Sequence, residues 1–188
     1  SRVRHAILTH FDELNRTGLR ESVARWIDAL PPQFIAPELQ LKRATLAIDL
    51  GQVDTALRLC TNAIVLYESE GQRDALALAL IERSLALSRI GRYADAMEDC
   101  EQALSLLPDG EAADSLRGRA YRYLGRYHGE TGDADSALHY LSLAQECWDR
   151  CQEPPVRKAR LAQDMGMAYE LHGQFSQAIV HYTRAQSE

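Results

Sequence analysis

The chain has 188 residues, of which 46% are hydrophobic and 26% charged, a composition ordinary for a folded protein. Its formal net charge of -6 argues against general nucleic-acid binding by this segment, since such binding depends on neutralising phosphates. No apolar run approaches the roughly 18 residues that a membrane span needs, and the first residues lack the apolar stretch of a signal peptide. Because the sequence lacks an initial Met and stops directly after a helical pattern, we interpret it as a fragment of a longer cytoplasmic protein.

Residues 1–36 are expected to form a degenerate N-terminal helix pair. Apolar residues recur at helical spacing on both sides of Gly18, namely Ile7, Phe11 and Leu14 before it and Val23, Ile27 and Leu30 after it. Pro31 and Pro32 then end the second helix, because proline cannot continue it.

Four later segments share one pattern, which starts at Gly51, Gly91, Gly132 and Gly173. An alanine follows each glycine by five residues, and a small residue precedes it by seven: Ala44, Ser84, Gly125 and Gly166. A left-handed glycine ends the first helix of each pair, and the small residue lets the two helices cross closely. No such pair buries its apolar face alone, so the pairs must stack.

This pattern resembles the tetratricopeptide repeat (TPR), and the resemblance covers residues from about 37 to 188. It predicts four repeats, at about 37–76, 77–117, 118–158 and 159–188. The glycines stand 40 or 41 residues apart, which we attribute to about one extra turn on each helix of the usual 34-residue repeat. The expected fold is all-α, a right-handed TPR-like superhelix of antiparallel helix pairs.

The segment before these repeats has a second resemblance. Residues 23–32 read Val-Ala-Arg-Trp-Ile-Asp-Ala-Leu-Pro-Pro, and Pro37 and Leu39 follow. This is similar to the start of the sensor region in MalT-like regulators, which are large ATP-binding activators of the LuxR family, with Ile27 where Leu is usual. The resemblance implies a nucleotide-binding domain upstream, a helix-turn-helix downstream and a repeat region that receives an inducer or a partner protein. The alternative is that Trp26 only anchors a capping helix.

The first helix of each TPR pair lines the concave groove, so its residues near the helix crossing are the predicted ligand contacts. They are Arg119, Arg122, Tyr123, Arg126 and Glu130, with Glu82, Ser88 and Arg89 on one side and Arg160, Gln163, Asp164 and Met167 on the other. The arginines at spacings of three and four share a helix face and suit a carboxylate or phosphate. Tyr123 would stack on a sugar ring or a peptide side chain. The alternative is a solvated face of salt bridges to Glu82, Glu130 and Asp164.

The remaining candidates favour packing over chemistry. Tyr121 and Tyr127 are expected to pack between repeats, and His128 to pack in the position where the repeat consensus has Tyr. The four cysteines are expected to be reduced and structural, because no second ligand pair has zinc-type spacing: Cys60, Cys100, Cys147 and Cys151. No metal or cofactor is expected.

No nucleophile with a positioned base and no paired-carboxylate site is recognisable, so we do not expect an enzyme. The leading hypothesis is the signal-receiving region of a bacterial transcriptional regulator, which binds a partner protein or a small anionic or sugar-like inducer. The alternative is a general scaffold that grips a peptide in its groove. A homodimer through the C-terminal helices is a third expectation, because Ala178, Tyr182 and Ala185 lack a following repeat.

Overall fold

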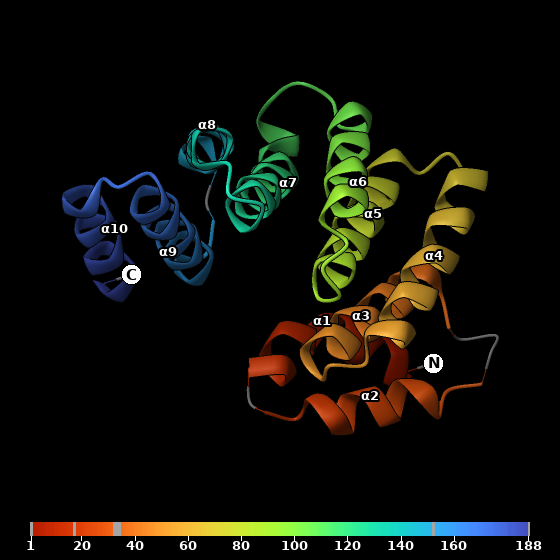
Figure 1. Ribbon diagram of the computed structural model, residues 1–188. Coiled ribbons are helices and arrows are strands. Elements are labelled where there is room, and N and C mark those ends of the chain that lie inside the picture. The colour runs from red at the N-terminus through yellow and green to blue at the C-terminus, as the bar shows by residue number, and fades with distance from the viewer. Residues whose placement is uncertain (1, 17, 32–34, 152, 188) are drawn as a thin grey trace. The chain divides into compact units, whose positions relative to one another are not determined.

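The computed structural model describes residues 2–16, 18–31, 35–151 and 153–187, and they fold into helices with no strand among them. The helices are α1 (Arg2–Arg16), α2 (Arg20–Asp28), α3 (Pro37–Asp49), α4 (Val53–Ser69), α5 (Arg73–Ser88), α6 (Tyr93–Leu106), α7 (Glu111–Glu130), α8 (Ala134–Arg150), α9 (Pro155–Leu171) and α10 (Phe175–Ser187). The all-α prediction is thus confirmed (Figure 1). None of these helices is long and apolar enough to cross a membrane.

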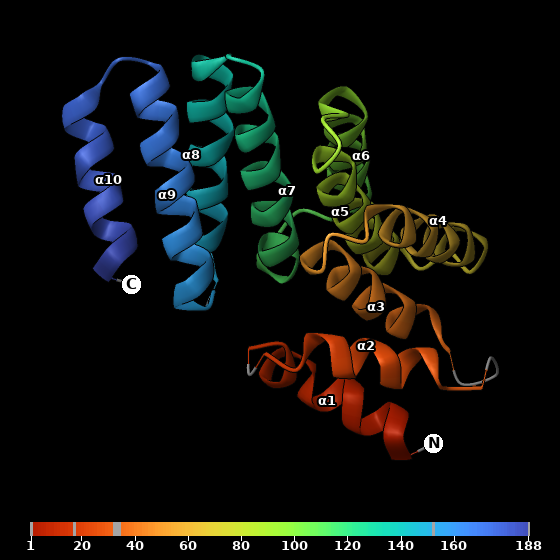
Figure 2. The same cartoon turned by 60° about the horizontal axis from the view of Figure 1, so that its bottom comes forward.

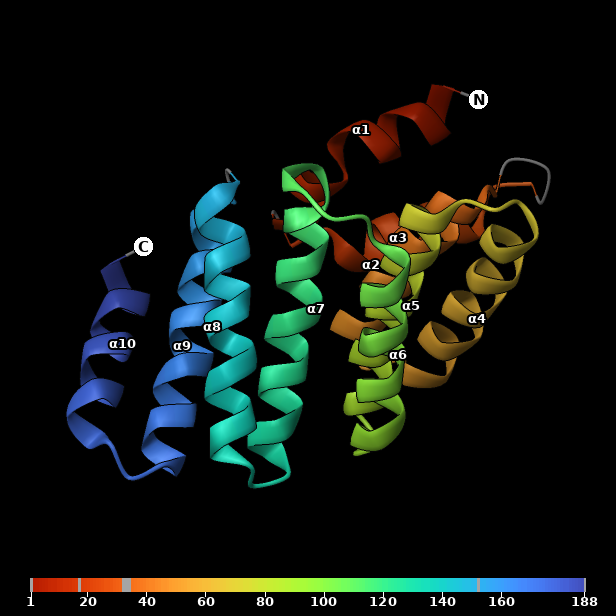
Figure 3. The ribbon, with the colours of Figure 1, turned by 90° about the horizontal axis from the view of Figure 1, so that it is seen from above.

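The chain divides into two compact units, Ser1–Arg92 and Tyr93–Glu188. In the first unit α3 packs against α4 and α4 against α5, and α1 and α2 lie against α3. In the second unit α6 packs against α7, and α7, α8, α9 and α10 follow one another as neighbours (Figures 2 and 3). Because α7 also contacts α9, three helices of the second unit meet around one region.

The turn glycines adopt the left-handed conformation that the sequence pattern requires. The φ angles of Gly51, Gly91, Gly132 and Gly173 are 72°, 73°, 88° and 81°. After each of them, the next residue's amide donates to a carbonyl five residues back, for example Asp133 to His128 over 2.9 Å. Gly71 makes the same turn between α4 and α5, with a φ of 68°, and the repeat pattern did not single it out.

The predicted helix crossings are also confirmed in the second unit. A Cβ added to Gly125 would lie 2.7 Å from Cγ of Leu141, and one added to Gly166 would lie 2.6 Å from the ring of Tyr182. Gly118 makes a further close approach, to the indole of Trp148. Because each of these glycines has no side chain, the neighbouring helix can approach closely.

The predicted repeat limits at residues 77, 118 and 159 fall inside α5, α7 and α9. The sequence pattern marks where helices cross and turn, and does not mark where the first helix of a pair begins. The division into repeats stays a prediction. The helices themselves begin and end at the bounds given above. In the N-terminal segment α2 ends before Pro31, and the other predicted stop, Pro32, lies outside the described residues.

The expectation that Ala178, Tyr182 and Ala185 of the last helix form an uncovered face needs a correction. Ala178 is buried, and Tyr182 and Ala185 are half-buried. The ring of Tyr182 packs at Gly166 of α9, so this side of α10 faces its own partner helix. The exposed apolar residues of α10 are Phe175, Ile179 and Val180.

Candidate functional site

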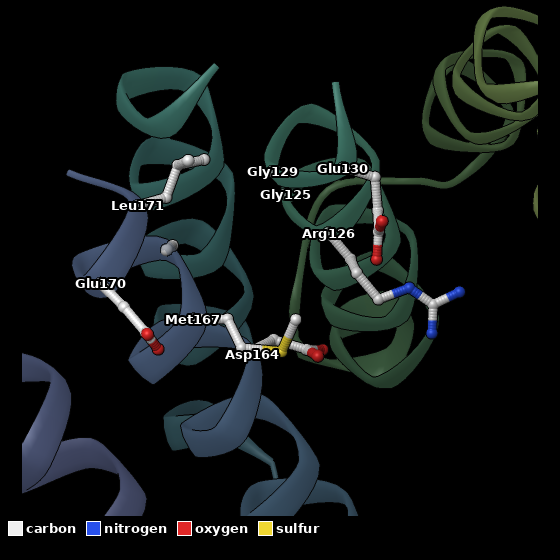
Figure 4. Close-up of a pocket in the computed structure, with 9 residues that line it drawn as sticks. Gly125, Arg126, Gly129, Glu130, Asp164, Met167, Glu170 and Leu171 are labelled. Atoms are coloured by element: carbon white, nitrogen blue, oxygen red, sulfur yellow. The ribbon is translucent and has the colours of Figure 1, made fainter. Parts of the chain in front are cut away.

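A pocket of about 390 Å³ lies between α7 and α9 in the second unit (Figure 4). Each helix contributes one side, with Gly125, Arg126, Gly129 and Glu130 from α7 and Asp164, Met167, Ala168, Glu170 and Leu171 from α9. This volume falls in the usual range for pockets that enclose a small ligand or a few side chains.

Two glycines one helical turn apart shape the α7 side of the pocket. Gly125 has no side chain because α8 lies against it, where a Cβ would come within 2.9 Å of the Ala137 carbonyl oxygen. Gly129 is less crowded, since an added Cβ would only reach ordinary contact with Ala137 at 3.8 Å. Both missing side chains would point toward α8, so the two glycines contribute only bare backbone to the α7 side of the pocket.

A buried ion pair joins the two helices at the pocket. Arg122 of α7 donates from Nη1 to Oδ2 of Asp164 of α9 over 2.7 Å. The Arg122 guanidinium also lies over the ring of Tyr123, 4.7 Å from its centroid. Burial raises the pKa of Asp164, and the positive charges of Arg122, Arg126 and Arg160 oppose that rise. The pair thus fixes α9 against α7 and sets the spacing of the pocket walls.

Arg126, at the α7 edge of the pocket, stacks with two tyrosines of the same helix. Its guanidinium lies 5.4 Å from the ring centroid of Tyr123 and 5.5 Å from that of Tyr127. Figure 4 shows the side chain extending away from α9, with the carboxylate of Glu130 beside it. Arg126 and Glu130 therefore form a charged rim on the α7 side, while the interior is left to other residues.

The α9 side is mainly apolar. Met167 and Leu171 are 46% and 48% exposed, large fractions for apolar side chains, and Ala168 is buried between them. The carboxylate of Glu170 accepts a hydrogen bond of 2.8 Å from the hydroxyl of Tyr182, so α10 holds it. The pocket therefore has a mainly apolar wall on α9, backbone of two glycines on α7, and charged side chains at its edge.

The structure brings together four of the predicted ligand contacts at this pocket, namely Arg126, Glu130, Asp164 and Met167. Arg122 and Tyr123 differ from the prediction, because both are buried and Arg122 is held by Asp164. The salt-bridge alternative thus describes Arg122. Half-buried Arg119 and exposed Arg160 and Gln163 stand on the same two helices but are not among the lining residues.

The predicted contacts from α5 lie in the first unit and are mostly not open to a ligand. Glu82 is buried and accepts a hydrogen bond of 3.2 Å from the hydroxyl of Thr45. Ser88 is nearly buried, and its hydroxyl donates to the Leu85 carbonyl. Arg89 is exposed directly after α5. On α5, a position predicted to face the groove therefore did not ensure that the side chain is exposed.

Sequence reasoning missed five of the lining residues, namely Gly125, which it singled out only as a helix crossing, and Gly129, Ala168, Glu170 and Leu171. Gly125 and Gly129 are one helical turn apart on α7, but the face on which they lack side chains packs against α8, so the spacing signals the helix crossing and not the pocket. Nothing in the α9 sequence indicates which of its apolar residues would stay uncovered.

The other aromatic residues pack against neighbouring helices, and the ring on which Tyr121 stacks lies in its own predicted repeat and not in the next one. Tyr127 is fully buried, and its ring centroid lies 6.1 Å from that of Tyr93 of α6. Tyr121 and His128 both stack on Tyr140 of α8, with centroids 6.3 and 5.3 Å away. These rings are therefore part of the joints between helices.

All four cysteines are free thiols, three of them buried and Cys151 half-buried. Burial raises the pKa of the Cys147 thiol, so it is protonated at neutral pH. Across the described residues, no three His, Cys, Asp or Glu side chains gather in a way that could hold a metal ion.

No protein-family model matches the sequence. The chain is 27% identical over 176 residues to the tetratricopeptide repeat and J domain-containing co-chaperone DNJ1 of Fusarium oxysporum f. sp. lycopersici. That match covers 89% of this chain and 31% of the relative, so the chain spans about a third of the relative's length.

Solved structures show the same architecture at lower identity. A thermophilic TPR protein of Thermus thermophilus superposes with a TM-score of 0.76 at 15% identity, covering 98% of this chain and 90% of that one. The Rap conjugation gene regulator of plasmid pLS20, in complex with the Phr* peptide, gives 0.74 at 17% identity, over 98% of this chain and 51% of that one. BtubC from P. vanneervenii gives 0.70 at 18% identity, over 98% and 76%. The chain therefore has the all-helical fold of TPR-like repeat proteins.

Proposed function

We propose that the chain is a protein-interaction module that holds a peptide in the pocket between α7 and α9. The observation that carries this proposal is the pocket's construction, with the exposed apolar side chains of Met167 and Leu171 on α9 and the bare backbone of Gly125 and Gly129 on α7. Such a pocket takes an apolar side chain of a peptide, while Arg126 and Glu130 at the rim are placed for its polar backbone or charged neighbours.

The buried ion pair supports this function by holding the site ready. Arg122 and Asp164 link α7 to α9 before any ligand arrives, so little ordering of the two helices is left for the binding step. The exposed Met167 and Leu171 belong to the same fixed helix. Binding would therefore need mainly side-chain adjustments.

The similar proteins support the same kind of ligand. The structural neighbour from plasmid pLS20 is a complex with a peptide, and the fungal relative is a co-chaperone. A catalytic role is not part of the proposal.

The experiment is a selection of peptides from a surface-displayed library on the immobilised chain, followed by affinity measurements on purified peptides. We expect Met167→Lys to weaken the selected peptides by at least about ten-fold, since it places a charge in the apolar wall. Val156→Lys is the matched control, because Val156 is a similarly exposed apolar residue of α9 outside the pocket.

Two results would contradict the proposal. Peptides that bind both variants as tightly as the parent chain would show that the pocket is not the binding site. If no peptide is selected, but sugar phosphates raise the melting temperature of the parent chain and not of Arg126→Ala, the ligand is the small anionic inducer that the sequence suggested.

A finer version places this module in a transcriptional regulator, as its signal-receiving region in the cytoplasm. The resemblance of residues 23–39 to the start of the MalT-like sensor region supports it, as does the regulatory role of the pLS20 neighbour. Trp26 is 47% exposed while Val23, Ala24 and Ile27 fill the core beside α2, so anchoring a cap is not the main role of Trp26. Sequencing the flanking DNA tests this version, which requires a phosphate-loop motif upstream and a helix-turn-helix downstream.

A further inference from the structure

Lysine and arginine are distributed unevenly along the helices of the second unit. Residues 127–149 and 161–183 contain no Lys or Arg. Each stretch includes the last turn of one helix, the turn that follows and the first turn of the next, α7 to α8 in one case and α9 to α10 in the other. The two turns lie at the same end of the unit, since Nε2 of His172 is 3.0 Å from Oδ1 of Asp135. The helix ends that meet at this turn end therefore carry acidic side chains and no Lys or Arg.

Basic side chains gather at the opposite end of α9. Its first two turns carry Arg157, Lys158 and Arg160, whereas its last turn carries Glu170 and no basic residue. A helix dipole favours acidic residues in the first turn and basic residues in the last, so this order of charges does not stabilise α9. The stability of the helix therefore does not account for Glu170 at the pocket.

Two exposed carboxylates stand where the pocket reaches the turn end. Glu130 is the last residue of α7, and Glu170 is the last but one of α9, so each helix contributes one. Glu170 is held in place through Oε2, which accepts the hydrogen bond from the Tyr182 hydroxyl. A carboxylate has about four acceptor positions, so this one bond does not use up its capacity for a ligand.

The other charged lining residues do not cancel these two carboxylates. Asp164 is neutralised by Arg122 within the buried ion pair. Among the lining residues the cation is Arg126, whose guanidinium lies over the rings of Tyr123 and Tyr127 and extends away from α9 (Figure 4). Two carboxylates against one guanidinium leave the pocket with a net negative charge.

We propose that the pocket prefers peptides in which a Lys or Arg stands within two positions of the apolar residue, and that this basic side chain binds at Glu130 and Glu170. The inference rests on the proposed function, since it specifies which peptides the pocket takes. Glu130 stands one helical turn after Arg126, and a turn rises about 5.4 Å. An extended peptide advances about 3.3 Å per residue, so a basic side chain one or two positions from the apolar residue reaches the carboxylates. This charge is opposite to that of the anionic ligand expected from the sequence.

The probes are three pools of fluorescently labelled nine-residue peptides with blocked termini and Leu at the centre. The two positions on each side of Leu are all Lys in the first pool, all Gln in the second and all Glu in the third, and the outer positions hold the same mixture of Ala, Ser and Thr. A fourth pool keeps the lysines but has Ser at the centre, so it measures attraction by the net charge of the chain alone. Fluorescence anisotropy with the full chain gives the affinity of each pool.

We expect the Lys pool to bind at least about three-fold more tightly than the Gln pool and about ten-fold more tightly than the Glu pool. The Ser-centred pool should bind more weakly than the Lys pool, because it lacks the apolar residue. The preference for Lys should shrink as the salt concentration rises from about 0.05 to 0.5 M, since exposed charges are screened.

Charge-removing substitutions locate the preference. Glu130→Gln and Glu170→Gln keep the size of the side chain and a hydrogen-bonding oxygen, and each should lower the ratio of Lys-pool to Gln-pool affinity by about half. Glu146→Gln is the matched control, because Glu146 is exposed on α8 outside the pocket and its substitution removes the same charge from the chain. This control should keep the ratio of the parent chain.

Failure of the preference and failure of the proposed function give different results. If the parent chain binds the Lys and Gln pools equally and Met167→Lys weakens both, the pocket takes peptides and the preference is overturned. The preference is also overturned if Glu146→Gln lowers the ratio as much as Glu130→Gln and Glu170→Gln, or if the Ser-centred pool binds as tightly as the Lys pool. If no Leu-centred pool binds, or Met167→Lys leaves the affinity of the Gln pool unchanged, the pocket is not a peptide site and both proposals are overturned.

Discussion

Arg122 of α7 and Asp164 of α9 are 42 residues apart along the chain and form an ion pair. Their side chains are only 9% and 11% exposed. A charge pair this deeply buried keeps its geometry because breaking it would leave one charge without water or a partner. Since Asp164 also lines the pocket, the pair couples the stability of the second unit to the shape of the site.

Removing one member of this pair should be costly. We expect Arg122→Met to lower the free energy of unfolding by about 3–5 kcal/mol, because Asp164 would remain buried without its partner. The double variant Arg122→Met with Asp164→Leu should recover most of that loss. Urea denaturation of the parent chain, the two single variants and the double variant measures the coupling. A cost below about 1 kcal/mol for Arg122→Met would mean that water replaces the arginine.

The same variant should also show a pH signature. Burial already raises the pKa of Asp164, and loss of the arginine charge raises it further. The folded state then binds a proton that the unfolded state releases, so Arg122→Met should become more stable as the pH falls toward the ordinary carboxyl pKa. Denaturation at several pH values between about 4 and 8 tests this, and a flat difference from Arg122→Met/Asp164→Leu would contradict it.

The two pocket glycines make a matched pair of substitutions. Gly129→Ala has room for its methyl group and should stabilise the chain by up to about 1 kcal/mol through helix propensity. Gly125→Ala should destabilise by about 1–3 kcal/mol, because its methyl group would collide with Leu141 and the Ala137 carbonyl. Melting temperatures should therefore move in opposite directions, and a shift of the same sign in both variants would count against the α7–α8 packing.

His181 should make the second unit sensitive to mild acid. Its ring stacks on Tyr169 with centroids 5.1 Å apart, and its buried Nδ1 has no hydrogen-bond partner among the described residues. Burial lowers the pKa of His181, and the nearby Arg184 lowers it further. The unfolded state then binds the proton first, so stability should fall as the pH drops below the ordinary histidine pKa.

Replacing His181 by Phe keeps the stack and removes the titration. The pH dependence between about 7.5 and 5.5 should become flatter in His181→Phe. His139 is exposed on α8, and His139→Gln is measured beside it as the comparison variant. An identical slope in the parent chain and His181→Phe would assign the acid sensitivity to another group.

Features that depend on backbone conformation could be predicted from the sequence. Gly132 and Gly173 mark turns because a left-handed φ nearly requires glycine, and Gly125 and Gly166 mark crossings because a side chain would collide there. These local requirements repeat at a fixed interval, so the fold could be recognised without knowledge of any distant contact.

The site could be predicted only in part. Helix periodicity indicated that Arg122 and Arg126 share a face of one helix, but it did not indicate how closely Asp164 of α9 approaches α7. That approach decides which arginine is buried in an ion pair and which stays at the rim. Likewise, the exposure of Met167 and Leu171 depends on how α9 lies against α7, which no single helix sequence determines.

The most direct test of peptide binding at the pocket uses the chain's three methionines, Met97, Met165 and Met167. Methyl-labelled methionine gives one NMR signal for each, and the three residues differ in place: Met167 lines the pocket, Met165 is buried on the same helix, and Met97 lies on α6. On titration with a selected peptide, we predict that the Met167 methyl signal shifts to saturation while the Met97 signal stays in place. Saturable binding of the peptide with an unchanged Met167 signal would contradict the proposed site.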